Sequence, residues 1–412
     1  MKRRLRLLII WIFAVLFLTS CAKKVYNDPQ IEQKDDLTVE ELGVPTLDHY
    51  PYDTNSRNVW DMVIFRDKLY VASGDAVQNT GPCPVYAYDL KANYSETNEQ
   101  TWVLSGLLND EQICRFVPLL GSLAIPGYDP CLGVYDWNYG TFYFLQGEKW
   151  VVIDSIPNGV HNYDMVEFNN AVYAGLAVQH EHQPVVRSTD GCKTWEELPF
   201  YKHGEQLVFE ENSLIQVHNL IKYDSQLYAY FLNSNHSDKG SFSLYRYEND
   251  SFYYYDTDWA NSLYINKEKT PEEIIKATAE LNGKLFFVST SLYSSKQELH
   301  SIEAVRLPVS CKVWDLIKQD DMLYVLTGTY SAEGKYRIAV YSSKTGESGT
   351  FQEEVSFFYE LPARSFEVYH DQFYFGTAAE YDSLDLVTMN RPVLNNEKVG
   401  MILRAPKGLH MV

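Results

Sequence analysis

Apolar and polar positions alternate in a twelve-residue pattern that recurs seven times along the chain. Each copy combines a strand-like stretch, a tight polar turn and a second stretch rich in aromatic and β-branched residues, as in WDMVIFRDKLYV and YDMVEFNNAVYA. The copies begin 38 to 58 residues apart, at Trp60, Cys114, Tyr163, His218, Lys276, Trp314 and Arg364. A repeat of about 50 residues with one hairpin, and space for another, is typical of a β-propeller blade. The pattern therefore predicts an all-β fold, a single seven-bladed β-propeller.

The seventh repeat lacks a fourth strand, because GMILRA (400–405) is the last strand-like stretch of the chain. An edge left open in this way needs a partner. We expect residues 44–50, VPTLDHY, to pair with it and close the ring. The propeller domain then spans residues 44–412, and residues 21–43 form a flexible tether that begins at Cys21.

The first twenty residues have the pattern of an export signal. A cationic start, MKRRLR, precedes the apolar run LLIIWIFAVLFL and the small-residue end LTSC. This resembles the bacterial lipoprotein signal, in which residues 1–20 are removed and the cysteine, here Cys21, becomes the lipid-bearing first residue. The resemblance implies an extracytoplasmic protein of the bacterial cell envelope, anchored to a lipid bilayer by its acyl chains and not spanning it. Which membrane carries it is left open.

Charge and cysteine content narrow the range of partners. Removal of residues 1–20 changes the formal charge from −20 to −24, which argues against nucleic acid as a partner because phosphate binding needs clustered Lys and Arg. Five cysteines remain after Cys21, so at most two disulfides can form. We expect a disulfide among Cys83, Cys114 and Cys131, with the pair left open. No CxxC spacing occurs, so a zinc knuckle is not supported. We expect no metal site and no cofactor.

The stretch STDGCKTW (188–195) lies in a turn between the third and fourth strands of the third repeat. Ser188, Asp190, Thr194 and Trp195 match the Asp-box of sialidase-type propellers, which this turn resembles, although Cys192 stands where a glycine is usual. The resemblance implies a structural role on the outer rim. An Asp side chain can accept bonds from its own turn, and the Trp can pack between blades. The equivalent stretch 342–351 lacks the aspartate.

The starts of the repeats are the candidate ligand-binding positions, because the inner strands of a propeller begin on one face and line its channel. They offer three carboxylates, two arginines and a histidine: Asp61, Arg115, Asp164, His218, Asp315 and Arg364. The alternative is that these aspartates bond neighbouring backbone and tie the blades together. The three-arginine cluster and the early Arg-Ile-Pro of sialidases are not found, so sialidase activity is not expected.

Two loops on the same face add further candidates. Residues 126–140 contain Asp129, Asp136 and Trp137, and carboxylates beside aromatic faces suit a carbohydrate, although the loop can also pack on itself. Residues 177–184 contain His180 and His182, with His161 and His218 nearby in the pattern. Such imidazoles could serve as acid and base. Alternate residues of a strand point in opposite directions, however, so His180 and His182 are poorly placed for joint metal ligation.

Three hypotheses for function follow. The first is a non-catalytic binding propeller on a lipid anchor, for a glycan or for an envelope or host protein. The second is a carbohydrate-active enzyme, a glycoside hydrolase or a polysaccharide lyase, that uses the channel-mouth carboxylates and histidines. The third is a scaffold or assembly lipoprotein, which a large exposed apolar patch would favour. The absence of a complete catalytic set in the sequence favours the first.

Overall fold

The computed structural model describes residues 38–91, 101–131, 139–209, 214–234, 241–255, 275–289, 291–296, 298–379 and 396–411. Within these ranges the regular structure is β-strand, with two short 3-10 helices, η1 (Asn55–Arg57) and η2 (Ala76–Gln78), and no α-helix. All of these residues belong to one compact unit that spans 37–412. The predicted all-β class is therefore confirmed for the described residues. No helix in these ranges has the length and apolar character needed to cross a bilayer.

Strand pairing in the described residues gives five four-stranded sheets. The first two are β2 (Asp61–Phe65), β3 (Lys68–Ala72), β4 (Cys83–Asp89) and β5 (Val103–Leu108), and then β6 (Val117–Leu119), β7 (Ser122–Pro126), β8 (Tyr139–Gln146) and β9 (Lys149–Pro157). The next two are β20 (Ala277–Leu281), β21 (Lys284–Val288), β22 (Leu292–Lys296) and β23 (Ser301–Ala304), and then β24 (Lys312–Gln319), β25 (Met322–Tyr330), β26 (Tyr336–Ser343) and β27 (Gln352–Tyr359). The fifth is β28 (Ala363–Tyr369), β29 (Gln372–Thr377), β30 (Ile402–Pro406) and β1 (Glu40–Gly43).

The sixth sheet is larger and curled, with ten strands. Its strands are β10 (Gly159–Phe168), β11 (Ala171–Gln179), β12 (Val185–Ser188), β13 (Glu196–Glu197), β14 (Phe200–Lys202), β15 (Glu205–Gln206), β16 (Leu214–Tyr223), β17 (Gln226–Ser234), β18 (Ser241–Glu248) and β19 (Ser251–Tyr255). Two groups of strands are joined in it, because β11 pairs with β16 and β14 pairs in parallel with β19. Five separate sheets and one merged sheet therefore stand where the sequence predicts seven separate blades.

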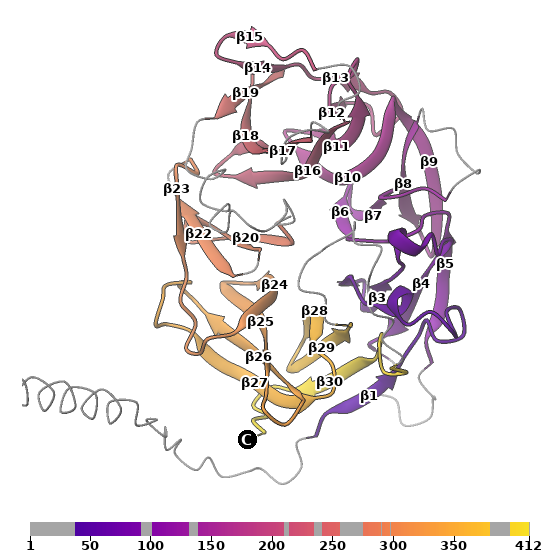
Figure 1. Cartoon of the computed structure of the whole chain (residues 1–412), viewed down its shortest axis with the longest axis vertical. Helices are drawn as coiled ribbons and strands as arrows, with labels where there is room; N and C mark the ends of the chain where they lie inside the picture. The colour runs from indigo at the N-terminus through magenta and orange to yellow at the C-terminus, as the bar shows by residue number, and fades with distance from the viewer. Residues whose placement is uncertain are drawn as a thin grey trace, which may run out of the picture. The chain divides into compact units, whose positions relative to one another are not determined.

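The sheets are arranged like the blades of a propeller. Figure 1 shows them set around a common centre, with β6, β10, β16, β20, β24 and β28 turned toward it. We call these six strands and β2 the inner strands, because all seven line the same central cavity. The apolar core lies in layers between neighbouring sheets. Leu69 and Val71 of β3, for example, pack in one cluster with Tyr374 of β29 and Ile402 of β30.

The polar turns, most of which follow an inner strand, have the geometry that a tight hairpin requires. Both central residues have positive φ in the turns at 66–67, 169–170, 224–225, 249–250 and 282–283. This is the type I′ conformation, whose twist matches that of the flanking strands and which favours Asn, Asp and Gly. Asn169, Asn170, Asn282 and Gly283 fit this rule. The sequence therefore identifies these hairpins through turn chemistry as well as strand pattern.

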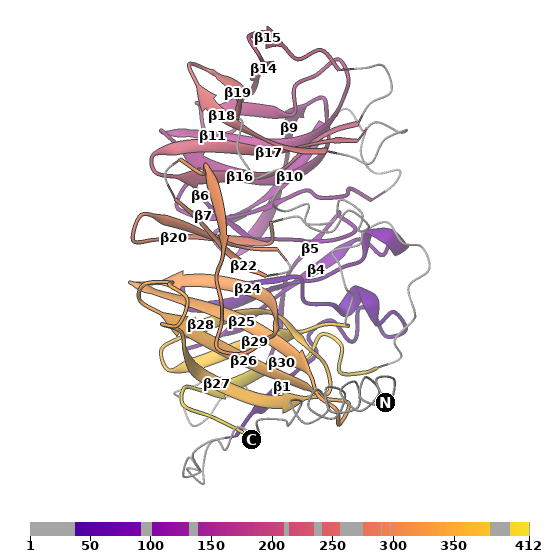
Figure 2. The same cartoon turned by 60° about the vertical axis from the view of Figure 1, so that its left-hand side comes forward.

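The ring is closed by a strand other than the one expected. β1, residues 40–43, pairs with β30, while residues 44–50 form turns (Figures 1 and 2). Two ion pairs fix the register, since Arg404 Nε donates to Glu40 Oε2 at 3.0 Å and Lys398 Nζ to Glu41 Oε1 at 3.0 Å. Pro45 cannot donate to a strand ladder, which disfavours pairing by the later segment. The prediction for 44–50 was wrong by about four residues, and 40–43 does not belong to a tether.

Candidate functional site

A cavity of about 630 Å³ lies between the inner strands. The inner strands run in the same direction, since corresponding positions of neighbouring strands contact one another. We call the end of the cavity at which they begin the mouth. The polar and aromatic lining residues near the mouth are Trp60, Asp61, Arg115, Asp164, Lys276 and Asp315.

Three of the predicted site residues, Asp61, Asp164 and Asp315, occupy equivalent positions and make equivalent bonds. One carboxylate oxygen of each accepts the N–H of the following residue at 2.9 to 3.0 Å. The other accepts an N–H from the next inner strand, given by Phe116 at 2.7 Å, Leu220 at 2.9 Å and Phe366 at 3.4 Å respectively. These aspartates therefore link one inner strand to the next, as the sequence allowed.

Cations compensate these carboxylates at the mouth. Arg115 Nη1 lies 3.1 Å from Asp164 Oδ2, and Lys276 Nζ lies 3.9 Å from Asp315 Oδ2. Burial raises the pKa of Asp61 to about 7, helped by the charge of Asp315, and burial lowers the pKa of Lys276 to about 8. At neutral pH the Asp61 carboxyl is therefore only partly ionised, so the carboxylates and cations at the mouth carry less net negative charge than their residue types suggest.

Arg364, another predicted site residue, is held between two indoles. Its Cζ lies 4.2 Å from the centroid of the Trp60 ring and 5.9 Å from that of Trp314. A guanidinium over an aromatic face is an attractive arrangement. Lys276 Nζ donates to the Arg364 carbonyl oxygen. The repeats that begin with Trp60, Lys276, Trp314 and Arg364 therefore meet at one side of the mouth.

On the other side of the mouth, two predicted histidines enclose a tyrosine. Tyr163 stacks on His218 with ring centroids 4.2 Å apart and on His161 at 5.7 Å. His161 Nδ1 lies 3.6 Å from Asp129 Oδ1. Burial lowers the pKa of His161 to about 4 and that of His218 to about 3, and it raises the pKa of Asp129 to about 6. Both imidazoles are therefore neutral at pH 7.

The other two predicted histidines contact different residues. His182 Nδ1 lies 2.9 Å from Glu197 Oε1 of β13, and His180 Nε2 lies 3.5 Å from Glu181 Oε1. Neither His180 nor His182 lines the central cavity. No group of three or more His, Cys, Asp or Glu side chains in the described ranges is placed to hold a metal ion.

The remaining expectations concern cysteines and one loop. Cys83, Cys114 and Cys131 are free thiols, as are the other described cysteines, so the expected disulfide is not formed. Burial raises the pKa of Cys114 to about 12 and that of Cys131 to about 11. Asp136 and Trp137 lie outside the described residues.

The turn at 188–195 is held by its aspartate. Asp190 Oδ1 accepts the N–H groups of Lys193 and Thr194, each at 3.0 Å, and Oδ2 accepts the Thr194 hydroxyl at 2.7 Å. Ser188 Oγ donates to Asp190 Oδ1 at 2.9 Å. These bonds hold the pKa of Asp190 well below its usual range. Trp195 packs against the β6–β9 sheet, with its ring centroid 6.3 Å from that of Phe142.

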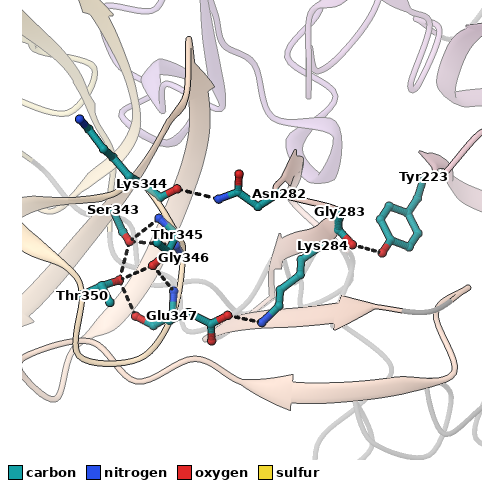
Figure 3. A network of polar contacts seen from close by, with 10 residues as sticks. All are labelled: Tyr223, Asn282, Gly283, Lys284, Ser343, Lys344, Thr345, Gly346, Glu347 and Thr350. Carbon is teal, nitrogen blue, oxygen red and sulfur yellow. Dashed lines mark hydrogen bonds and ion pairs between the residues drawn. The ribbon is translucent and has the colours of Figure 1, made fainter.

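The equivalent turn between β26 and β27 uses hydroxyls in place of the missing aspartate (Figure 3). Ser343 Oγ accepts the Gly346 N–H at 2.8 Å and lies 2.6 Å from Thr350 Oγ1. The turn also reaches the neighbouring sheet, because Glu347 pairs with Lys284 and Asn282 Nδ2 donates to the Lys344 carbonyl oxygen at 2.8 Å. Both turns therefore fasten adjacent sheets on the outside of the ring.

Sequence reasoning missed several residues at or near the mouth. Lys276 and Glu367 line the cavity, and Tyr163 stacks between the two histidines. Lys276 and Tyr163 were visible as first residues of repeats but were not chosen as candidates, whereas His218 and Arg364, which are also first residues, were chosen. Glu367 gave no signal, because it lies four positions into its strand and its carboxylate accepts the N–H groups of Val368 and Ile64.

Comparison with known proteins identifies no family. No protein-family model matches the sequence, and no curated protein matches it significantly. Solved structures similar to the chain include the computationally designed Ika8 protein, with 8% identity, a TM-score of 0.43 and coverage of 86% of this chain and 98% of that one. A putative 6-phosphogluconolactonase from Bacteroides fragilis has 10% identity, a TM-score of 0.42 and coverage of 76% and 88%. A chain of a mitotic checkpoint complex has 8% identity, a TM-score of 0.47 and coverage of 93% and 97%.

Proposed function

We propose that the protein is a lipid-anchored binding protein of the bacterial cell envelope, which holds a carbohydrate at the mouth of its central cavity without transforming it. The observation that carries this proposal is the bonding of Asp61, Asp164 and Asp315. Each carboxylate accepts two backbone N–H bonds, and two of them also lie beside a cation. Carboxylates engaged in this way support the scaffold and are poorly placed to serve as nucleophiles or bases.

The composition of the mouth favours a carbohydrate over other ligands. Trp60, Arg115 and Lys276 line the cavity there, and the Arg364 guanidinium lies over the Trp60 ring. Aromatic faces pack against the C–H groups of a sugar ring, while charged side chains bond to its hydroxyls. A cavity of about 630 Å³ is within the usual range for small-ligand sites.

The test is a glycan array probed with the chain from Ala22, which keeps every described contact, because these all lie within the unit 37–412. We expect binding to one class of oligosaccharide, with the bound sugar recovered unchanged in mass. Lys276→Gln removes a cation that lines the mouth and should weaken binding, whereas Lys193→Gln, on the outer turn, should not. Binding that is insensitive to Lys276→Gln, or cleavage of the sugar, would contradict the proposal.

We also propose that the fold is a seven-bladed propeller in which two blades are merged. Seven inner strands line the cavity, and the ten-stranded sheet holds two of them, β10 and β16. Each of these two strands is also linked to a neighbouring sheet, since Asn162 Nδ2 of β10 donates to the Thr141 carbonyl oxygen of β8 at 3.1 Å and Asn219 Nδ2 of β16 to that of Ile275, just before β20, at 2.9 Å. A crystal structure with fewer or more than seven inner strands would contradict this count.

The envelope location rests on the N-terminal sequence. Processing at Cys21 would leave a mature chain that begins with a diacylglyceryl cysteine. Mass spectrometry of the protein extracted from a bacterial membrane fraction tests this. Cys21→Ser should leave the signal uncleaved and unlipidated, and a normally processed, membrane-bound Cys21→Ser protein would contradict the proposal.

One observation favours catalysis as a second candidate function. His161 is neutral at pH 7, lies 3.6 Å from the Asp129 carboxylate and stacks on Tyr163. A neutral imidazole can accept a proton as a general base, and a nearby carboxylate favours the protonated form. His161→Gln and His218→Gln, made separately, discriminate between the two functions. A glycan-degrading activity that either substitution abolishes would replace binding with a lyase or hydrolase function.

A further inference from the structure

A second cavity, of about 290 Å³, lies at one end of the β24–β27 sheet. It is formed where β24 begins, β25 ends and β26 begins. Its side chains include Lys312, Trp314, Tyr330 and Tyr336, with the backbone of Gly328 and Thr329 between them. The Trp314 ring also lies near Arg364, whose Cζ is 5.9 Å from the ring centroid and 4.2 Å from that of Trp60, a residue that lines the central cavity.

The indole of Trp314 forms one wall of this cavity and is fixed by a close contact. Trp314 is only 6% exposed, and a Cβ at Gly328 would lie 2.6 Å from its Nε1 atom. Only glycine permits this approach of the ring to the strand. Trp314 Nε1 has no hydrogen-bond partner in the described structure. This N–H is buried against the strand, so the contact with Gly328 fixes the plane of the indole at the wall of the cavity.

The opposite wall is exposed and aromatic. Tyr330 is 62% exposed, although its ring lies only 4.9 Å, centroid to centroid, from that of the buried Tyr336. The ring is therefore supported on one side and open to solvent on the other. An exposed, supported phenol beside a cavity of this size suits a single ligand ring that offers a face of C–H groups. A cavity of about 290 Å³ lies near the lower bound of about 300 Å³ for small-molecule sites.

The charge beside this cavity is positive, in a chain whose formal charge is −20. Lys312 Nζ lies 4.0 Å from the centroid of the Trp314 ring, and Arg364 Cζ lies 5.9 Å from it. Two cations therefore flank one indole. A local positive field in an acidic protein attracts an anionic group, and the ammonium can bond to it directly.

We propose that this cavity is a subsite for one anionic pyranose, a sugar ring that carries a carboxylate or a sulfate. The inference rests on the proposed carbohydrate function and specifies the ligand class. The sugar ring packs on Tyr330, and its anionic group bonds to Lys312. The rest of the chain of sugars extends toward the mouth, where Trp314 and Arg364 adjoin the central cavity.

Calorimetric titration of the chain from Ala22 tests this with three probes: oligogalacturonate, a carrageenan-derived oligosaccharide that carries sulfate but no carboxylate, and cello-oligosaccharide. The first two arms distinguish carboxylate from sulfate, and the third is neutral. We expect an acidic probe to bind at least tenfold more tightly than the neutral one. Lys312→Met should weaken acidic binding about tenfold or more, and Lys312→Arg should largely retain it. Lys222→Met removes an exposed lysine from another inner strand and serves as the control.

The aromatic contact has its own variant. Tyr330→Ala should weaken the binding of all probes that bind, whereas Tyr52→Ala, at a tyrosine 96% exposed and outside both cavities, should not. Thermal unfolding of each variant controls for loss of the fold. If no probe binds, the proposed carbohydrate function is contradicted. If probes bind but the neutral one binds equally well, or Lys312→Met has no effect, only the anionic subsite is contradicted.

Discussion

Substitution of Asp164 tests the idea that buried carboxylates join the inner strands. Asp164 is 6% exposed, and its carboxylate accepts the Met165 N–H at 3.0 Å and the Leu220 N–H at 2.9 Å. It also forms an ion pair with Arg115, whose Nη1 lies 3.1 Å from Asp164 Oδ2. Asp164→Ala leaves two buried N–H groups and one buried guanidinium without their acceptor. Breaking a buried ion pair by removal of one partner costs about 3–5 kcal/mol, which includes most of the effect of the orphaned groups.

The expected change in melting temperature follows from the size of the domain. A unit that spans residues 37–412 has an unfolding entropy of about 0.8 kcal/mol/K, so a loss of about 3–5 kcal/mol lowers the midpoint by about 4–6 °C. Differential scanning calorimetry of the chain from Ala22 measures this directly. Asp321→Ala, at an exposed turn carboxylate, is the matched control and should change the midpoint by less than about 1 °C.

A double variant separates the ion pair from the backbone bonds. Arg115→Met, added to Asp164→Ala, removes the uncompensated guanidinium and should recover part of the lost stability. The orphaned N–H groups remain, so recovery should be incomplete. A midpoint for Asp164→Ala within about 1 °C of the wild type would refute the structural role of this carboxylate. A double variant less stable than Asp164→Ala would refute the role of the charge.

Three further predictions concern other contacts. Burial lowers the pKa of His218 from 6.5 to about 3, so the folded state resists protonation of this imidazole. The stability of the fold therefore falls as the pH drops below 6.5, by about 2 kcal/mol at pH 5. Calorimetry at pH 7.5 and 5 should show a smaller loss of stability in His218→Gln than in the wild type, and an equal loss in both would contradict this. Asp190→Ala should speed hydrogen exchange at the Lys193 and Thr194 amides without affecting sugar binding, and unchanged exchange would show that the aspartate does not hold the turn. Gly376→Ala places a Cβ 2.3 Å from a side-chain carbon of Val59 and should lower the free energy of unfolding in urea by about 1–3 kcal/mol. An unchanged free energy of unfolding would mean that Val59 moves aside at little cost.

The sequence pattern was sufficient for the inner hairpins, because each combines strand periodicity with a turn of Asn, Asp or Gly. It was insufficient for the merged sheet, since pairing of β11 with β16 depends on two edges that meet only in three dimensions. The closing strand was misplaced for a similar reason. Glu40 and Glu41 look like tether residues until Arg404 and Lys398 come opposite them.

The candidate site was predicted in part. The shared position of Asp61, Asp164 and Asp315 was evident in the repeats, but a sequence cannot show that both oxygens of each carboxylate are engaged. The cavity beside Trp314 was not foreseen, because it depends on the ends of three strands and on the absence of a side chain at Gly328. Asp136 and Trp137, outside the described residues, stay predictions.

The central claim is that this protein binds a carbohydrate where its inner strands begin. Thermal unfolding of the chain from Ala22, measured against acidic and neutral oligosaccharides, tests it most directly. A ligand at one hundred times its dissociation constant stabilises the folded state by about 2.7 kcal/mol, which for this domain raises the midpoint by about 3 °C. We predict such a shift with an acidic oligosaccharide, and its reduction in Lys312→Met. No shift with any oligosaccharide would contradict the account.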